Sequence, residues 1–225
     1  MISMLKFYQA LGFERLPIEV KKDKSMMRMT SGQAQTLSGK MKAQALKALR
    51  EEIGDCTRCT LSRKRTHIVF GEGDPHAMLM FIGEAPGREE DIQGRPFVGD
   101  AGMLLTRLIE RMGLMRKDFY IANIVKCRPP MNRDPGPEEI ETCRAFLEKQ
   151  IEIIAPKVIM TLGRIAVQTL MDNPKLKITS IRGKFFDYKG IPVMPTFHPA
   201  YLIRNPKDKW LTWEDAQKVL ERLKE

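Results

Sequence analysis

The sequence has no run of eighteen apolar residues, and its N-terminal segment has no short apolar core followed by a small-residue cleavage site. The first absence argues against a membrane-spanning helix, and the second argues against a secretory signal. We therefore expect a soluble, intracellular protein.

Cysteine is also scarce, with 4 residues in 225. So few cysteines in an intracellular chain of this size argue against a scaffold built on disulfides. Metal binding, catalysis and inert burial remain as possible roles for them.

Acidic residues are outnumbered by basic ones, 28 against 38, which leaves a formal net charge of +10 at pH 7 and a pI near 9.5. This balance favours a polyanionic partner such as nucleic acid. A generally charged soluble protein is the plainer alternative, because 29% of the residues are charged. The hydrophobic content of 43% is enough for a core and excludes global disorder.

Short apolar segments alternate with segments of helical periodicity along most of the chain. The expected strands are residues 77–82, 119–125, 157–162 and 191–196, and the expected helices are residues 42–53, 100–112, 137–154, 163–171 and 214–223. Asp100 is placed to cap its helix, and residues 182–190 suggest a hairpin arm before the last strand.

This alternation predicts one α/β domain over residues 41–225, with a central, mostly parallel four-stranded sheet flanked by helices. Residues 1–40 form an N-terminal extension to which the sequence assigns no structure. In such sheets, ligands bind beyond the carboxyl ends of the strands. Three loops that follow strands should therefore meet in one cleft: "GEAPGREED", "KCRPPMNRDPG" and "FHPAYLIRNP".

The first of these loops looks like a glycine-rich phosphate loop, but it carries Glu84, Glu89, Glu90 and Asp91. It also lacks the lysine of the GxxxxGK[ST] pattern. Both features argue against an enzyme that binds nucleotide phosphates there.

All four cysteines fit one site. Cys56 and Cys59 form a CxxC pair, and Cys127 and Cys143 can complete a set of four thiolates. The spacing is compatible with tetrahedral zinc or with a [4Fe–4S] cluster. A redox-active CxxC with two unrelated buried cysteines is the alternative.

The third loop contains His198 directly after a strand, with Pro199 to rigidify the turn. A lone histidine is more often structural, but here the apolar Leu202 and Ile203 and the basic Arg204 follow it. An apolar wedge beside a basic residue can open and hold a nucleic-acid stack.

The second loop is preceded by Asn123, whose amide could match the edge of a base or merely cap the loop. Lys126 and Arg128 in this loop are candidates for DNA phosphates.

These motifs together resemble the family 4, iron–sulfur-containing uracil-DNA glycosylases of archaea and bacteria. The resemblance is carried by "CTRC", "GEAPGREEDIQGRPFVGDAG", "NIVKCRPPMNRDP" with the cysteine after it, "LGRIA" and "FHPAYLIRNP", and it covers roughly Cys56 to Pro206. It implies a [4Fe–4S] cluster on Cys56, Cys59, Cys127 and Cys143.

The resemblance also implies roles around a flipped uracil. Phe97 would stack on the base, Asn123 would read its edge and His198 would face O2. Gly83 and Ala85 would line the uracil pocket, although related families place an Asp or Asn at the position of Ala85 to handle water. Catalytic acids would come from Glu84, Glu90 and Asp91.

The implied activity is hydrolysis of the N-glycosidic bond of uracil in single- or double-stranded DNA, without a lyase step, as part of base excision repair. The resemblance further implies a cytoplasmic prokaryotic protein, which we expect to be a monomer. A non-catalytic iron–sulfur module that binds nucleic acid is the alternative, but the acidic loop does not suit it.

Overall fold

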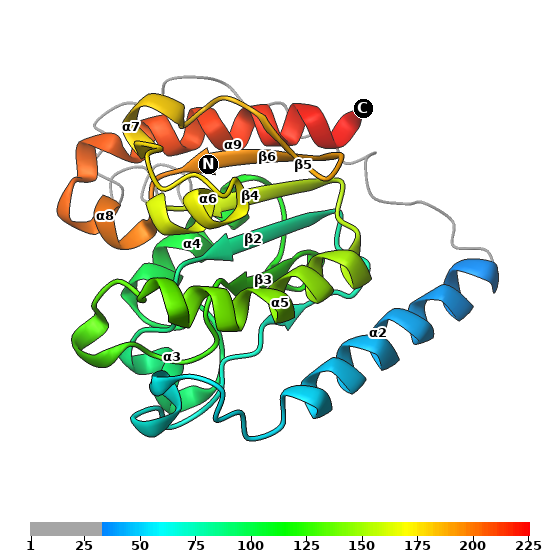
Figure 1. The fold of residues 1–225 in the computed structure, drawn as a ribbon. Coiled ribbons are helices and arrows are strands. Elements are labelled where there is room, and N and C mark those ends of the chain that lie inside the picture. The colour runs from blue at the N-terminus through cyan, green and yellow to red at the C-terminus, as the bar shows by residue number, and fades with distance from the viewer. Residues whose placement is uncertain (1–32) are drawn as a thin grey trace.

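The computed structural model describes residues 33–225. Residues 1–32, most of the expected N-terminal extension, lie outside the described part of the chain. Residues 33–39 belong to helix α2 (Gln33–Ile53), which begins nine residues before the expected helix at 42–53. Figure 1 shows α2 running along the outside of the molecule, and Leu46, Leu49 and Ile53 are buried.

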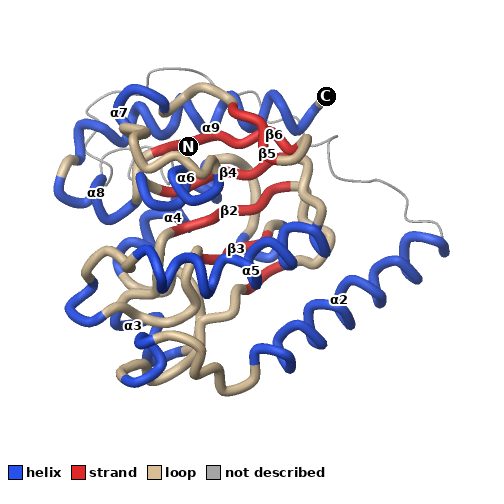
Figure 2. The backbone as a smooth tube through the Cα atoms, viewed as in Figure 1, coloured by secondary structure: helices blue, strands red, loops and turns tan. Residues whose placement is uncertain are grey.

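The sheet has six strands rather than the expected four, in the order β1-β3-β2-β4-β6-β5 (Figure 2). The four expected strands form its parallel centre: β2 (Leu79–Gly83), β3 (Tyr120–Asn123), β4 (Val158–Leu162) and β6 (Ile191–Thr196). Two short antiparallel strands, β1 (Glu72–Gly73) and β5 (Phe186–Tyr188), flank this centre.

The two flanking strands were not predicted because they are short and lack an apolar pattern. Strand β1 has two residues and β5 has three, and neither is an apolar run. Their register is decided by pairing with β3 and β6, which is a tertiary property. The expected hairpin arm at residues 182–190 is confirmed, because β5 pairs with β6 around the turn at Lys189 and Gly190.

Helices cover both faces of the sheet, as the alternation predicts. Helices α5 (Pro137–Ile154) and α6 (Arg164–Leu170) cross the front face in Figure 1, and α4 (Asp100–Arg111) and α9 (Lys209–Lys224) cover the opposite face. The shorter helices are α3 (Arg88–Gln93), α7 (Ile178–Ile181) and α8 (Pro199–Arg204), with 3-10 turns η2 (Thr60–Arg63), η3 (Arg116–Asp118), η4 (Pro130–Asn132) and η5 (Pro206–Asp208).

The expected cap at Asp100 is wrong by one position. Gly99 occupies the N-cap, and Asp100 is the first helical residue, where its charge favours the positive end of the helix dipole. Helix α5 begins as expected with Pro137, and the Glu139 carboxylate accepts a hydrogen bond of 2.7 Å from the Gly136 N–H.

The core lies between the sheet and its helices, and every residue of β2, β3 and β4 is buried. Such burial on both faces is typical of parallel strands and explains their near-continuous apolar sequences. Within residues 33–225, no helix combines the length and the apolar character needed to cross a bilayer.

Candidate active site

The parallel strands end at the same edge of the sheet, and the side chains predicted to recognise a base meet there. Gly83 ends β2 and pairs with Asn123, which ends β3. A Cβ atom on Gly83 would lie 2.4 Å from Asn123 Oδ1 and 2.6 Å from Cζ of Phe97. Only glycine therefore lets the amide and the aromatic ring approach the end of β2 this closely.

Asn123 is 1% exposed, and its Oδ1 atom is buried without a hydrogen-bond partner in the described part of the chain. Buried polar atoms are nearly always paired, so an orphaned oxygen needs an explanation. Its position beside the Phe97 ring fits an acceptor kept open for a ligand's N–H donor.

Phe97 is buried and has a left-handed backbone with φ of 51°. Such strain in a non-glycine residue persists only where its surroundings enforce it. Its carbonyl oxygen packs so tightly against Gly102 that a Cβ there would lie 1.9 Å from it. The Phe97 and His198 rings are 5.8 Å apart at 35°, so the two residues border the same space.

His198 precedes α8, and its Nδ1 atom accepts a hydrogen bond of 3.1 Å from the Ala200 N–H. Burial lowers the pKa of His198 to about 4; the charge of Glu90 opposes this shift, and that of Arg204 adds to it. The imidazole is therefore neutral at pH 7 and carries its proton on Nε2, because Nδ1 acts as the acceptor. The site thus contains a fixed neutral N–H donor.

Glu84 follows β2, and its pKa is raised to about 7, chiefly by burial and secondarily by Asp134, while Arg164 opposes the shift. Its carboxylate makes no hydrogen bond to any described residue. A half-buried carboxyl group that titrates near neutral pH is suited to general-base work. Ala85, the next residue, is half-buried and packs on the hydrophobic core.

Sequence reasoning did not assign Asp134 and Arg164, which form an ion pair of 2.5 Å beside Glu84. Arg164 begins α6 directly beyond β4, and Asp134 lies in the connection between β3 and α5. Their position beyond the carboxyl ends of predicted strands could have identified both as candidate site residues.

The three expected catalytic acids differ in the hydrogen-bond partners of their carboxylates. Both oxygens of the Glu90 carboxylate accept hydrogen bonds from the backbone. The donors are the N–H groups of Gly87, Val98 and Gly99, at 2.9–3.1 Å. Glu90 therefore shapes the loop that carries Phe97.

Asp91 is 3% exposed and faces another segment. Its Oδ1 atom accepts hydrogen bonds from the N–H groups of Thr66 at 2.9 Å and His67 at 3.4 Å. Asp91 thus ties α3 to the chain that follows the CxxC pair, and Glu84 is the expected acid that stays free of such bonds.

The expected contact of Lys126 with DNA is wrong, because this side chain is 1% exposed. Its ammonium donates hydrogen bonds to the Asn123 carbonyl oxygen at 2.8 Å and to Gln150 Oε1 at 2.6 Å. It supports the end of β3 from inside the protein. Arg128 is half-buried, with Nε bound to Asn132 Oδ1 at 2.8 Å.

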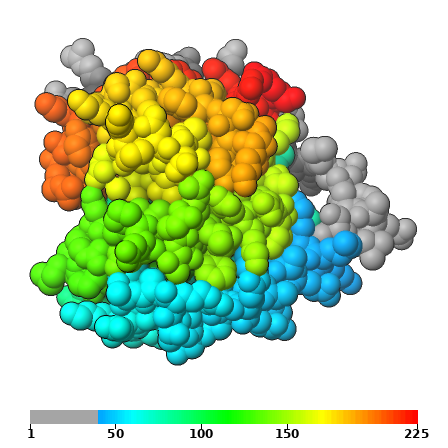
Figure 3. All heavy atoms as spheres, in the orientation of Figure 1, coloured from blue at the N-terminus to red at the C-terminus, as the bar shows by residue number. Residues whose placement is uncertain are grey.

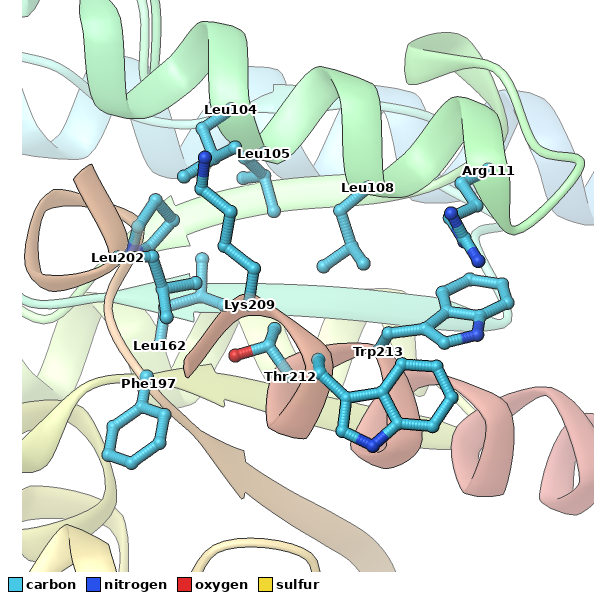
Figure 4. A pocket seen from close by; sticks show the side chains of 12 residues that line it. Leu104, Leu105, Leu108, Arg111, Leu162, Phe197, Leu202, Lys209, Thr212 and Trp213 are labelled. Carbon is cyan, nitrogen blue, oxygen red and sulfur yellow. The ribbon is translucent and has the colours of Figure 1, made fainter. Parts of the chain in front are cut away.

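The expected wedge residue Leu202 also points inward, with 4% of its surface exposed. It lines an apolar cavity between α4, α8 and α9, together with side chains such as Leu105 and Phe197 (Figure 4). The outward positions of α8 are Ile203, which is 45% exposed, and Arg204. This is the pattern of a helix with one buried face.

Two of the three segments that were expected to be loops lie at the same end of the molecule, but most of "FHPAYLIRNP" forms helix α8. Helix α8, in orange, and the loop that enters α5, in green, extend at the left edge of the molecule in Figure 3. The basic side chains Arg204 and Arg128 belong to these segments.

The four cysteines line one small cavity with Arg65 and Lys126. Cys127 Sγ accepts a hydrogen bond of 3.6 Å from Arg65 Nη1, and Cys143 Sγ accepts one of 3.3 Å from the Lys126 N–H. None of the four is in a disulfide. Because all four cysteines line the same cavity, Cys127 and Cys143 are not unrelated to the CxxC pair.

Within the described ranges, no three potential ligands come close enough to hold one metal ion. Tetrahedral zinc at about 2.3 Å from each sulfur needs thiolates about 3.8 Å apart. Burial raises the pKa of Cys127 to about 11.

Comparison with known proteins agrees with this geometry. Residues 70–224 match the Uracil DNA glycosylase superfamily. A type-4 uracil-DNA glycosylase of Thermotoga maritima is 49% identical over 172 residues, which are 75% of this chain and 90% of that protein. The chain belongs to the uracil-DNA glycosylase superfamily.

Two archaeal type-4 uracil-DNA glycosylases are similar to nearly the same extent. The protein of Saccharolobus solfataricus is 48% identical over 79% of this chain and 86% of its own length. That of Sulfurisphaera tokodaii is 46% identical over 79% of this chain and 84% of its own length. The chain thus spans most of these uracil-DNA glycosylases, and its matched region includes the whole carboxyl edge of the sheet.

Proposed function

We propose that this protein removes uracil from DNA by hydrolysing the N-glycosidic bond, leaving an abasic site. The observation that carries the proposal is the buried, unpartnered Oδ1 of Asn123 beside the Phe97 ring and Gly83. A flat, neutral base with an N–H donor on its edge suits this place, and the names of the similar proteins support uracil as that base.

Recognition follows from the hydrogen-bonding groups of the amide. Asn123 Oδ1 would accept from uracil N3–H, and Asn123 Nδ2 would donate to O4, while Phe97 stacks on the ring. Cytosine has an unprotonated N3 and an amino group at C4, so it would oppose acceptor with acceptor and donor with donor. Leaving such buried groups unpaired is costly, which makes the pocket selective.

Cleavage pushes electrons onto the base, and negative charge develops at O2. His198 would donate its Nε2–H to O2, as a preorganised dipole that need not change protonation. Because the pKa of His198 is about 4, the imidazole is already neutral at physiological pH.

Positive charge develops on the sugar at the same time. Glu84 in its ionised form would stabilise this charge and orient the attacking water. We assign it this role over Glu90 and Asp91, whose carboxylates are held by backbone N–H groups.

This assignment predicts the pH dependence of the reaction. The active form of Glu84 is ionised, and its pKa is about 7, so the single-turnover rate should rise with pH through 7 and level off above 8. Glu84→Gln should remove this step and lower the plateau by about 100-fold. Glu89→Gln changes an exposed carboxyl group of the same loop and should leave the profile intact. A wild-type profile that is flat between pH 6 and 8 would contradict the assignment.

The target base is inaccessible inside a duplex, so the nucleotide must be flipped out at a cost of a few kcal/mol. Ile203 would fill the vacated stack, in place of the buried Leu202, and Arg204 and Arg128 would hold phosphates. Single-stranded DNA avoids the unpairing cost and can serve as a substrate as well.

We also propose that Cys56, Cys59, Cys127 and Cys143 hold a [4Fe–4S] cluster. The donor set fits: four thiols border one cavity, and two of them accept hydrogen bonds from Arg65 and the Lys126 backbone. The resemblance of the motifs to the iron–sulfur-containing family 4 uracil-DNA glycosylases favours a cluster over a single zinc ion, although four thiolates suit either centre. The cluster would cross-link the segment after α2 to β3 and α5, and no step of the reaction is assigned to it.

Removal of a ligand tests this role. Cys143→Ser should remove the iron and the absorbance near 400 nm, and it should lower the melting temperature by about 10 °C, equivalent to a few kcal/mol in a protein of this size. Thr142→Ser, a conservative change next to it in the same cavity, should retain both properties. Iron content that is unaffected by Cys143→Ser would exclude this residue as a ligand.

The activity itself is tested with a labelled oligonucleotide that contains one uracil. Incubation followed by alkali should break the strand at uracil alone, whereas omission of alkali should leave it intact because no lyase step is expected. Binding of the oligonucleotide without any alkali-labile site would instead favour the non-catalytic module.

A further inference from the structure

The loop that carries Phe97 is held by a side chain that comes from elsewhere in the chain. Arg116 lies in η3, between α4 and β3, and its guanidinium reaches back to two consecutive carbonyl groups. Nη1 donates to the Phe97 carbonyl oxygen at 2.9 Å, and Nη2 donates to that of Pro96. One planar fork therefore binds both peptide groups next to the strained residue.

Other hydrogen bonds fix the position of the short turn that carries Arg116. The Asp118 carboxylate accepts a hydrogen bond of 2.7 Å from the Met115 N–H, which closes the short turn that presents Arg116. Thr106 on α4 lies 3.5 Å from Arg116 Nη1, and the guanidinium is partly buried. Because the turn is closed in this way, the backbone of Arg116 has a defined position from which its side chain extends.

Phe97 is thus held from two directions. Glu90 binds the N–H groups of Val98 and Gly99 on one side, and Arg116 binds the carbonyl oxygens on the other. A left-handed phenylalanine is unfavourable by itself and relaxes when such contacts are lost. Its relaxation would swing the ring away from Gly83 and His198.

We propose that Arg116 is a positioning residue for uracil recognition, which holds the Phe97 ring in the orientation that stacks on the flipped base. This inference deepens the proposed function and rests on it. Arg116 acts on the base only through Phe97, which is the property that separates it from a residue that merely stabilises the fold.

Arg116→Ala should lower the single-turnover excision rate by about 10- to 100-fold, the range for losing hydrogen bonds to a charged group. The inhibition constant of free uracil should rise in parallel, while affinity for uracil-free duplex DNA stays within about twofold. Arg116→Lys keeps the charge but not the fork, so it should fall between Arg116→Ala and wild type. It also serves as the decisive variant if Arg116→Ala does not fold.

Arg95→Ala is the matched control. Arg95 is exposed, lies two residues from Phe97 and pairs with Glu72 at 2.7 Å. Its removal takes away the same charge without touching the two carbonyl groups, so excision should remain within about twofold of wild type.

A double-mutant cycle gives the sharpest test. In a Phe97→Ala background, Arg116→Ala should have almost no further effect on the rate or on uracil inhibition. An equal loss in both backgrounds, or wild-type rates for Arg116→Ala and Arg116→Lys, would overturn the inference while the proposed function stands. A wild-type protein that does not excise uracil would overturn the proposed function, and this inference with it.

Discussion

His198→Ala should lower the single-turnover rate of uracil excision by about 100- to 1,000-fold, the usual effect of removing one preorganised donor to a developing oxyanion. The loss should fall on the chemical step, because charge at uracil O2 grows only as the glycosidic bond breaks. Affinity for uracil-containing DNA should change by less than about tenfold. The measurement is excision at saturating enzyme, together with a separate binding titration.

The protonation state of His198 sharpens this prediction. Burial lowers its pKa to about 4, so the imidazole does not titrate between pH 5.5 and 8. Any pH dependence in that range should therefore survive in the residual activity of His198→Ala, since it belongs to Glu84. His76→Ala, at an exposed histidine outside the site, is the control and should behave as wild type. An unaltered rate in His198→Ala would exclude the donor role.

Asn123→Asp should reduce the preference for uracil over cytosine by about 10- to 100-fold, since a well-placed pair of hydrogen bonds contributes about 1–3 kcal/mol of discrimination between bases. The carboxylate keeps the acceptor for uracil N3–H but cannot donate to O4. It can instead accept from the amino group of cytosine. Uracil excision should fall, and slow cytosine excision should become detectable.

The test compares single-turnover rates on oligonucleotides that differ only in uracil or cytosine at one position. Asn173→Asp adds the same negative charge at an exposed site beyond α6 and should leave both rates unchanged. A preference for uracil that is unchanged in Asn123→Asp would mean that another group reads the base edge.

The two predictions concern side chains that different strands of the sheet place in the site. Asn123 is placed by the end of β3 and supported from inside by Lys126, whereas His198 is placed by the turn after β6 and packs against Gly163. A Cβ on Gly163 would lie 3.0 Å from that of His198, and its φ of 95° also requires glycine. Asn123 thus stands on a strand and His198 at the start of a helix, and side chains on such elements are placed more precisely than side chains on loops.

Local sequence was sufficient for the central architecture. The four parallel strands and helices α4, α5 and α6 between them are long or strongly apolar, so their periodicity identifies them without tertiary information. The short helices α3 and α7 in the same connections were not expected. The position of the site at the carboxyl edge follows from the same alternation. The edge strands β1 and β5 were beyond this reasoning, because their residues become strands only through their neighbours.

For the side chains of the site, too, the sequence supplied one part of the answer and the fold supplied the other. Sequence drew attention to Asn123 and His198 by residue type and by their place after a strand, and the family resemblance gave them their roles. It grouped Glu84 with Glu90 and Asp91, because carboxylates in one loop look equivalent until their hydrogen-bond partners are known. The fold separates them: backbone N–H groups occupy Glu90 and Asp91 and leave Glu84 free.

Charge and hydropathy alone also misplaced two residues. Lys126 is basic and lies in a basic loop, yet the turn after β3 directs it inward to Asn123 and Gln150. Leu202 and Ile203 are adjacent and equally apolar, and only the packing of α8 decides which of them faces solvent. The sequence by itself determined the class of fold, the edge that carries the site and the residue types available for recognition. The tertiary structure alone decided which of those side chains point into the site, because orientation depends on contacts between segments far apart in the chain.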